Sequence, residues 1–250
     1  MKLSVVIITY NEEQNIERCI KSILEIAGEI IVVDSYSTDR TKDICQKYGV
    51  KFFEKKWSGY SDQKNYADSL ASYNWIFSID ADEEVSSELK NAILSIKEKD
   101  YENLVFSVNR LTNYCGKWIR HCGWYPDTKI RIFNRNFVNW DDQLVHEELK
   151  IPDNFKTVNL KGDLNHYSYN SINDHLRQTQ KFTDLAAEQA VKIGKKAGIE
   201  KLILNPIWKF LRDFIIKMGF LDGKSGFNVC RISAYATYLK YKKTRDLYKK

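Results

Sequence analysis

The chain has 250 residues, of which 43% are hydrophobic and 29% are charged. This composition supports a large hydrophobic core and excludes wholesale disorder, while three Pro and eleven Gly exclude collagen-like or linker-rich designs. The formal net charge is +6, and residues 201–250 hold twelve Lys and Arg against three Asp. The basic character therefore belongs to the C-terminal part of the chain.

The N-terminal half alternates between apolar runs and amphipathic segments. The runs predict buried strands at residues 3–9, 29–34, 50–54 and 75–80. Apolar residues at helical spacing predict helices at 16–27, 38–48, 61–71 and 87–96. Four repeats of this kind predict an α/β fold with a doubly wound, mostly parallel sheet, in which ligands bind at the carboxyl ends of the strands.

The C-terminal half has a different pattern. Aromatic and basic residues alternate in three segments that predict strands, at 104–110, 115–121 and 129–135. Long amphipathic segments then predict helices near 171–196, 202–218 and 226–248. This half is therefore expected to differ from the N-terminal half and to end in a helical tail.

Four acidic residues lie at the end of the predicted strand at 75–80 or directly after it: Asp80, Asp82, Glu83 and Glu84. Charges this close repel one another, and a hard cation would relieve the repulsion. The chain has no glycine-rich phosphate loop, but Asp80 and Asp82 could hold Mg²⁺ or Mn²⁺ and, through it, a diphosphate. The alternative is a solvated acidic loop in which Glu83 and Glu84 favour the dipole of the next helix.

The chain resembles the family 2 glycosyltransferases, which have the GT-A fold, in SVVIITYNEEQNIERCIKSI, IIVVDSYSTDRTKDIC and WIFSIDADEEVS. It is similar to the bacterial lipopolysaccharide core β-1,4-glucosyltransferases in GYSDQKNYA, GWYPDTKIRIFNR, LVHEEL and GFLDGKSGF. The resemblance implies a GT-A domain at 1–200, with a nucleotide-sugar half at 1–100 and an acceptor and catalytic half at 101–200. A basic amphipathic helical tail at 201–250 would follow.

The resemblance also implies donor-binding residues. Thr9, Tyr10 and Glu12 match the segment that closes around the nucleobase and ribose. Asp34 matches the aspartate that hydrogen-bonds the base, with helix capping as the alternative. Lys64 matches a basic position near the donor, with a solvated helix lysine as the alternative.

By the same resemblance, Asp82 binds the metal, and Asp80 lies against the ribose or a metal-bound water. Transfer with inversion needs one general base to take the proton of the acceptor hydroxyl. Glu147 is the first candidate for this base, and Asp127 is the second, with acceptor binding as its alternative role. His146, beside Glu147, is a third candidate.

Four further residues, Trp124, Tyr125, Lys129 and Arg131, are candidates for stacking on the acceptor sugar or binding its phosphates. Core packing is the alternative for the aromatic members. No chemistry is assigned to His166.

The function implied is inverting, metal-dependent transfer of a single sugar, with glucose from UDP-glucose favoured, to a lipopolysaccharide core or related glycolipid. Transfer to a capsule or protein-linked glycan from another nucleotide sugar is one alternative. A non-catalytic protein that binds sugar nucleotides is the other.

The amphipathic tail predicts peripheral binding to a membrane, with packing on the catalytic domain or on a second subunit of a homo-oligomer as the alternative. No run approaches the ~18 apolar residues of a membrane-spanning helix, and the N-terminus lacks the pattern of a signal peptide. Five scattered cysteines predict reduced thiols. We therefore expect a cytoplasmic protein on the inner face of the inner membrane, and no nucleic-acid partner, because no such motif accompanies the charge.

Overall fold

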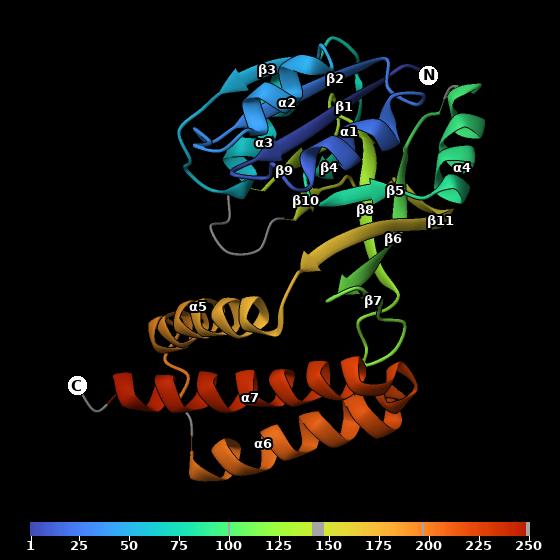
Figure 1. The fold of residues 1–250 in the computed structure, drawn as a ribbon. Coiled ribbons are helices and arrows are strands. Elements are labelled where there is room, and N and C mark those ends of the chain that lie inside the picture. Colours follow the sequence, from blue (N-terminus) through green and yellow to red (C-terminus); the bar gives the residue numbers. More distant parts are fainter. Residues whose placement is uncertain (100, 142–147, 197, 249–250) are drawn as a thin grey trace. The chain divides into compact units, whose positions relative to one another are not determined.

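Figure 1 shows a computed structural model of the chain, which describes residues 1–99, 101–141, 148–196 and 198–248. The chain forms two compact units, and each is built from two separate segments. Unit 1 comprises Met1–Arg110 and Asp127–His166, and unit 2 comprises Leu111–Pro126 and Tyr167–Lys250. The predicted boundary at residue 200 does not coincide with a boundary between these two units, and it stays a prediction.

The N-terminal part of unit 1 contains a parallel sheet. Its strands are β1 (Leu3–Thr9), β2 (Glu29–Asp34), β3 (Lys51–Glu54) and β4 (Trp75–Asp80), in the order β3-β2-β1-β4. The helices are α1 (Ile16–Ile23), α2 (Thr41–Lys47), α3 (Tyr60–Ser69) and α4 (Ser87–Lys97). The predicted alternation of strands and helices is confirmed, and with it the α/β class.

Strand β1 is buried on both faces, which explains its unbroken apolar sequence. Val5 and Ile7 point into one hydrophobic cluster, together with residues of α1 and α4. Val6 points into a second cluster, together with Ala67 of α3. The period of two along a strand thus gives each face of the sheet its own core.

Further strands extend the sheet beyond β4. Strand β8 (Asp127–Asn134) pairs antiparallel with β4 and with β6 (Leu104–Tyr114), and β5 (Glu83–Val85) pairs antiparallel with β11 (Lys156–Tyr169). The short strands are β7 (Lys117–Trp118), β9 (Asn139–Trp140) and β10 (Leu149–Lys150). The sheet is therefore mixed: β5 and β11 were not predicted, and the strand expected at 115–121 is confined to β7.

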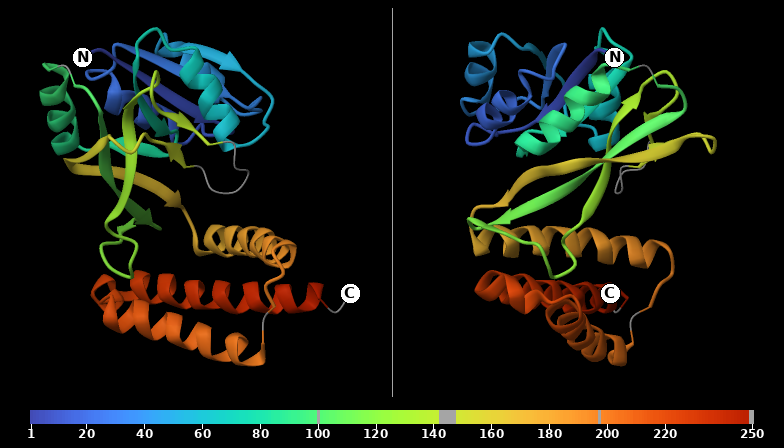
Figure 2. Two further views of the ribbon diagram at one scale, coloured as in Figure 1. Left: turned by 180° about the vertical axis from the view of Figure 1, so that it is seen from behind. Right: turned by 90° about the vertical axis from the view of Figure 1, so that its right-hand side faces the viewer.

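Unit 2 contains the three long helices predicted for the C-terminal half. They are α5 (Ile172–Lys192), α6 (Ile199–Leu211) and α7 (Gly223–Leu247), and α7 packs between α5 and α6 (Figure 2). A π-helical turn (Arg212–Ile216) and a 3₁₀ turn (Gly219–Asp222) connect α6 to α7. No helix in the described part of the chain is long and apolar enough to cross a membrane.

The core of unit 2 includes an aromatic group. Trp124 lies with its ring centroid 6.0 Å from that of Tyr114, 5.9 Å from that of Tyr169 and 5.7 Å from that of His175. Burial lowers the pKa of His175 to about 4, so this histidine is neutral. Packing, the alternative given for Trp124, is therefore what the structure shows.

None of the five cysteines forms a disulfide. Cys19, Cys45, Cys122 and Cys230 are buried, whereas Cys115 is exposed. The predicted reduced thiols agree with this arrangement.

Candidate active site

The carboxyl ends of three parallel strands bring the predicted donor residues of unit 1 together. Thr9 at the end of β1 is in register with Asp34 at the end of β2. Ile8 is in register with Asp80 at the end of β4 on the other side. The expected convergence at this edge of the sheet is therefore what the strand register shows.

Asp34 is almost fully buried and holds the turn that follows β2. Its carboxylate accepts hydrogen bonds from the backbone N–H of Ser37 at 2.6 Å and from the Ser37 hydroxyl at 2.5 Å. Asn11 ties the turn after β1 to the same segment, because its N–H donates to Ser37 Oγ and its Oδ1 accepts from the Thr38 N–H, each at 2.8 Å. The structure thus shows Asp34 in its structural role, and its contact with a nucleobase stays a prediction.

Thr9, Tyr10 and Glu12 follow along the same edge. The Thr9 hydroxyl is buried without a hydrogen-bond partner among the described residues, and Tyr10 is 56% exposed. Burial and, to a smaller extent, the charge of Asp82 raise the pKa of Glu12 to about 7. A hydrogen bond from the Asn15 side chain acts in the opposite direction and lowers this pKa. Glu12 therefore titrates near neutral pH.

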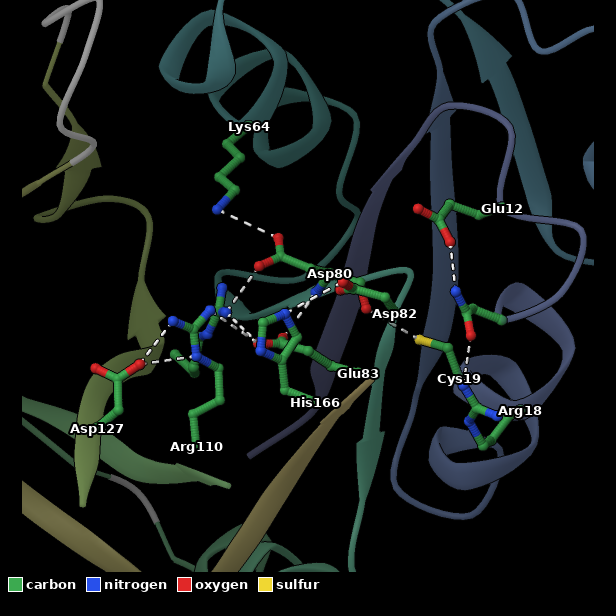
Figure 3. Close-up of polar contacts among 12 residues, drawn as sticks. Glu12, Arg18, Cys19, Lys64, Asp80, Asp82, Glu83, Arg110, Asp127 and His166 are labelled. Carbon is green, nitrogen blue, oxygen red and sulfur yellow. Dashed lines mark hydrogen bonds and ion pairs between the residues drawn. The ribbon is translucent and has the colours of Figure 1, made fainter. Parts of the chain in front are cut away.

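Arg131, from β8, pairs with two of the carboxylates after β4. Its Nη2 lies 2.8 Å from Asp80 Oδ2 and 2.6 Å from Glu83 Oε1, and Lys64 Nζ lies 3.4 Å from Asp80 Oδ1 (Figure 3 shows the surroundings). Burial works to raise the pKa of Asp80, but the charges of Arg131 and Lys64 outweigh it and lower this pKa. Burial raises the pKa of Glu83, although Arg131 opposes this. The repulsion in this acidic stretch is thus relieved largely by side chains of the protein.

The pairing and burial of these side chains bear on three expectations. Arg131 is 4% exposed and is held by Asp80 and Glu83, so its predicted contact with the acceptor is wrong. Glu83 is fully buried and belongs to β5, so it is not part of a solvated loop. Lys64 is buried as well, which excludes its alternative as a solvated helix lysine.

Lys64 links the site to the next layer of the fold. Its ammonium lies 4.5 Å from the centroid of the Trp140 ring, in a cation–π contact. The Trp140 indole N–H in turn donates to Asp68 at 3.1 Å. Burial raises the pKa of Asp68 to about 7, although this hydrogen bond and the charge of Lys64 lower it.

Asp82 has a different partner. His166, from β11, places its Nε2 3.2 Å from Asp82 Oδ2 (Figure 3). Burial lowers the pKa of His166, but the hydrogen bond with Asp82 and its charge outweigh burial and raise it. The charge of Asp82 therefore favours the protonated form of this imidazole.

Asp127 is held by two cations of neighbouring strands. Its carboxylate lies 2.6 Å from Arg110 Nη2 and 3.0 Å from Lys129 Nζ. Burial raises the pKa of Asp127, but these two partners outweigh burial and lower it. A carboxylate with a lowered pKa is a weak proton acceptor, which argues against Asp127 as a general base.

Asp82 and His166 are the residues of this site that could hold a divalent cation. The Asp82 carboxylate is 26% exposed, and its oxygen with His166 Nε2 offers one oxygen and one nitrogen donor once the histidine proton leaves. Within the described ranges, no three His, Cys, Asp or Glu side chains are arranged to hold a metal ion by themselves. Further ligands would have to come from water or phosphate oxygens, which is the usual mode of Mg²⁺.

The first candidate base lies outside the described residues. Glu147 and its neighbour His146 fall within 142–147, so their predicted roles remain predictions. The sequence pattern predicted other roles for Glu83 and Arg131 than the structure shows, and it assigned no chemistry to His166. A row of carboxylates needs counter-charges, which is a sequence signal for such partners, but pairing across β5, β8 and β11 decides which ones they are.

Polar and acidic side chains lie at three adjoining strand ends of a parallel sheet, which is the edge at which α/β proteins generally bind their ligands. The family model for glycosyl transferase family 2 matches residues 4–149, so this chain belongs to that family and is a glycosyltransferase.

Two curated relatives span nearly the whole chain. An uncharacterized glycosyltransferase of Rickettsia typhi is 33% identical and covers 98% of this chain and 87% of its own length. The lipopolysaccharide core biosynthesis glycosyltransferase LpsC of Rhizobium meliloti is 30% identical, with coverages of 96% and 90%.

Two solved structures are partly similar. S. aureus TarS gives a TM-score of 0.49 at 19% identity, covering 88% of this chain and 45% of its own. Glucosyl-3-phosphoglycerate synthase from Mycobacterium tuberculosis, in complex with Mn²⁺ and UDP, gives a TM-score of 0.38 at 22% identity. The match covers 45% of this chain and 44% of the synthase chain. These scores are low, so the function is argued below from the site and the family.

Proposed function

We propose that this glycosyltransferase moves a single sugar, with glucose from UDP-glucose favoured, to a lipopolysaccharide core or related glycolipid. The relationship to LpsC supports the acceptor class. The observation on which the donor site rests is the convergence of Thr9, Asp34 and Asp80 at adjoining strand ends, with Asp82 beside Asp80.

In this proposal different residues of unit 1 bind different parts of the nucleotide-sugar donor. Thr9, Tyr10, Glu12 and Asp34 hold the base and ribose, since they form the ends of β1 and β2 and the turns behind them. The exposed ring of Tyr10 is free to stack on a base.

Positive charges at the end of β4 would neutralise the negative charge of the donor diphosphate. Lys64 supplies a fixed cation against Asp80, and Asp82 with His166 would hold Mg²⁺ or Mn²⁺. When bound, such an ion supplies Lewis-acid neutralisation of the leaving diphosphate. With the leaving group stabilised in this way, no separate general acid is required.

The acceptor hydroxyl needs one base, and inversion follows from a single displacement at the anomeric carbon. We favour Glu147 over Asp127, because Arg110 and Lys129 hold the Asp127 carboxylate and lower its pKa. Asp127 then keeps Arg110 in place, and Arg110 lies 3.8 Å from the buried Glu83.

Calorimetric titration of UDP, ADP and GDP, each with and without Mn²⁺, tests the donor site. We expect UDP binding that Mn²⁺ strengthens at least about tenfold, and we expect Asp82→Asn to remove this gain while the metal-independent part remains. Asp153→Asn is the matched control, because Asp153 is an exposed aspartate of the same unit.

The outcomes separate the alternatives. If no nucleotide binds, or if D153N behaves as D82N does, the donor site is misplaced. Binding of ADP alone would keep the site and replace UDP-glucose by an ADP-sugar. UDP binding without transfer or donor hydrolysis, against any acceptor, would indicate a non-catalytic sugar-nucleotide-binding protein.

A further inference from the structure

Helix α6 and the turn after it expose a row of large apolar side chains. We call this row the apolar surface, and it consists of Ile203, Leu204, Ile207, Trp208, Leu211 and Ile215. Each of these residues is between 40% and 61% exposed. Contiguous apolar exposure of this kind marks a site that binds another molecule or a membrane.

The rest of unit 2 does not cover this helix. None of the thirteen residues of α6 is buried, although the helix packs along α7. Between the two helices runs a groove of about 530 Å³, whose lining is apolar apart from Arg231 and the hydroxyl groups of Tyr235 and Tyr238. A helix that only completed the core would bury its apolar residues instead.

The charges beside the apolar surface are mainly positive. Four basic side chains between residues 199 and 231 are exposed: Lys201, Lys217, Lys224 and Arg231. Of the acidic residues between 199 and 231, Asp213 and Asp222 are buried, and only Glu200 is exposed. Asp213 pairs with Lys209 at 2.6 Å and with Arg212 at 2.9 Å, so its charge is already compensated.

We propose that the apolar surface docks unit 2 on a bilayer that contains anionic lipid. The exposed side chains of α6 would enter the boundary between headgroups and acyl chains, with Trp208 at that boundary. The exposed lysines and Arg231 would face the anionic headgroups. This binding is peripheral, and it depends on unit 2 alone rather than on the donor site.

A second copy of the chain fits this surface less well. A two-fold interface places the same patch of each copy face to face, so the exposed basic residues of the two copies would repel one another. Lysine is also depleted in protein interfaces relative to other surfaces. An anionic bilayer offers acyl chains to the apolar side chains and negatively charged headgroups to the basic ones.

Flotation of the full chain with lipid vesicles tests this proposal. We expect it to float with phosphatidylcholine vesicles that contain roughly 30% phosphatidylglycerol at least about tenfold more than with pure phosphatidylcholine, and to float less as salt is raised. The double variant Ile207→Ser/Leu211→Ser should reduce binding to the anionic vesicles at least about tenfold. Phe137→Ser is the matched control, because Phe137 is 60% exposed and belongs to unit 1.

A second measurement tests whether the Trp208 side chain contacts the lipid. Brominated lipids quench tryptophan fluorescence on contact. We expect them to quench the fluorescence of the wild-type chain, and we expect Trp208→Phe to lose most of this quenching when equal amounts of vesicle-bound protein are compared. Circular dichroism checks that each variant is folded. The proposal is overturned if the wild-type chain does not float with anionic vesicles, or if F137S loses as much binding as the double variant. It is also overturned if the chain is a dimer that I207S/L211S converts to a monomer and vesicles do not bind.

Discussion

Arg131 is the residue on which the acidic end of β4 depends. It is almost completely buried, and it pairs with both Asp80 and Glu83. Removing one partner of a buried ion pair leaves uncompensated charge, which costs about 3–5 kcal/mol. We therefore expect Arg131→Met to lower the free energy of unfolding by about that amount in urea denaturation, with proportionate loss of donor binding.

Two further variants show whether the loss of stability in R131M comes from the lost counter-charge. Arg177→Met is the control, since Arg177 is 78% exposed and should cost less than about 1 kcal/mol. Adding Glu83→Gln to R131M should recover part of the stability, because one buried charge is removed. Equal losses in R131M and R177M would show that the arginine is not a structural counter-charge.

Glu29, at the start of β2, makes the stability of unit 1 depend on pH. Burial raises its pKa, but hydrogen bonds from Lys51, Ser4 and Ser72 outweigh burial and lower it to about 2. A carboxylate with a lowered pKa stabilises the fold above its unfolded pKa of 4.5, and this contribution is lost as the pH falls toward about 2. We expect Glu29→Gln to cost about 1–3 kcal/mol at pH 7, and the difference from wild type should shrink below about pH 4.5.

Urea unfolding at several pH values between about 7 and 3 measures this difference. Glu25→Gln serves as control, because Glu25 is 68% exposed and pairs with Lys90 at the surface. A loss in E29Q that is independent of pH would mean that shape or packing, not charge, makes Glu29 important.

Among the elements, β11 and α4 approach each other closely at Gly162. This residue has φ +93°, and a Cβ there would lie 2.2 Å from the backbone N of Leu89. Gly49 also has a positive φ, +64°, but open space surrounds it. We expect Gly49→Ala to cost about 1–2 kcal/mol from the backbone alone, and Gly162→Ala to cost about 2–5 kcal/mol because the clash adds to it.

Thermal or urea unfolding of the two glycine variants measures that difference. Similar losses would mean that α4 moves away from β11 without cost. Leu89 itself is buried in the core, so such a movement would also expose apolar surface.

The elements that the sequence predicted well are those with a strong periodic signal. Strands β1, β2 and β4 have the bounds expected, because they are apolar on both faces and end at polar turns. Strand β11 escaped prediction because only Leu160 and Leu164 of its fourteen residues are buried. The short β5 was missed because its acidic sequence is typical of a loop, whereas Arg131 and the β11 pairing keep it in the sheet.

Some residues of the candidate site could likewise be predicted from the sequence, and others could not. The positions at strand ends follow from local sequence, so Asp34, Asp80 and Asp82 could be found. The pairing of Asp82 with His166 spans a long stretch of chain and depends on β11, whose presence the sequence does not indicate. Local patterns contain no information on contacts of that kind.

At the scale of the whole molecule, the predicted boundary at residue 200 can be tested directly. Helix α5 lies before that boundary, yet it packs on α7 in unit 2, and its residues Thr183, Ala187 and Ala190 are buried. Removal of residues 199–250 would expose these side chains. We therefore expect the truncated chain to lose the amide protection of α5 in hydrogen exchange and to aggregate, while β1 and β4 stay protected.

A soluble monomer of residues 1–198 in which the α5 amides exchange as slowly as in the full chain would contradict that expectation. It would support a separable C-terminal tail, as the sequence pattern predicted.

The distribution of the cysteines has a practical consequence. Four of the five thiols are buried, and Cys115, at the turn between β6 and β7, is the exposed one. Although the residue is exposed, partial desolvation of its sulfur and the charge of Asp174 raise the pKa of this thiol, so labelling calls for mildly alkaline buffer. A maleimide dye would therefore attach to the natural chain at a single place in unit 2, giving a fluorescent reporter on that unit without an engineered residue.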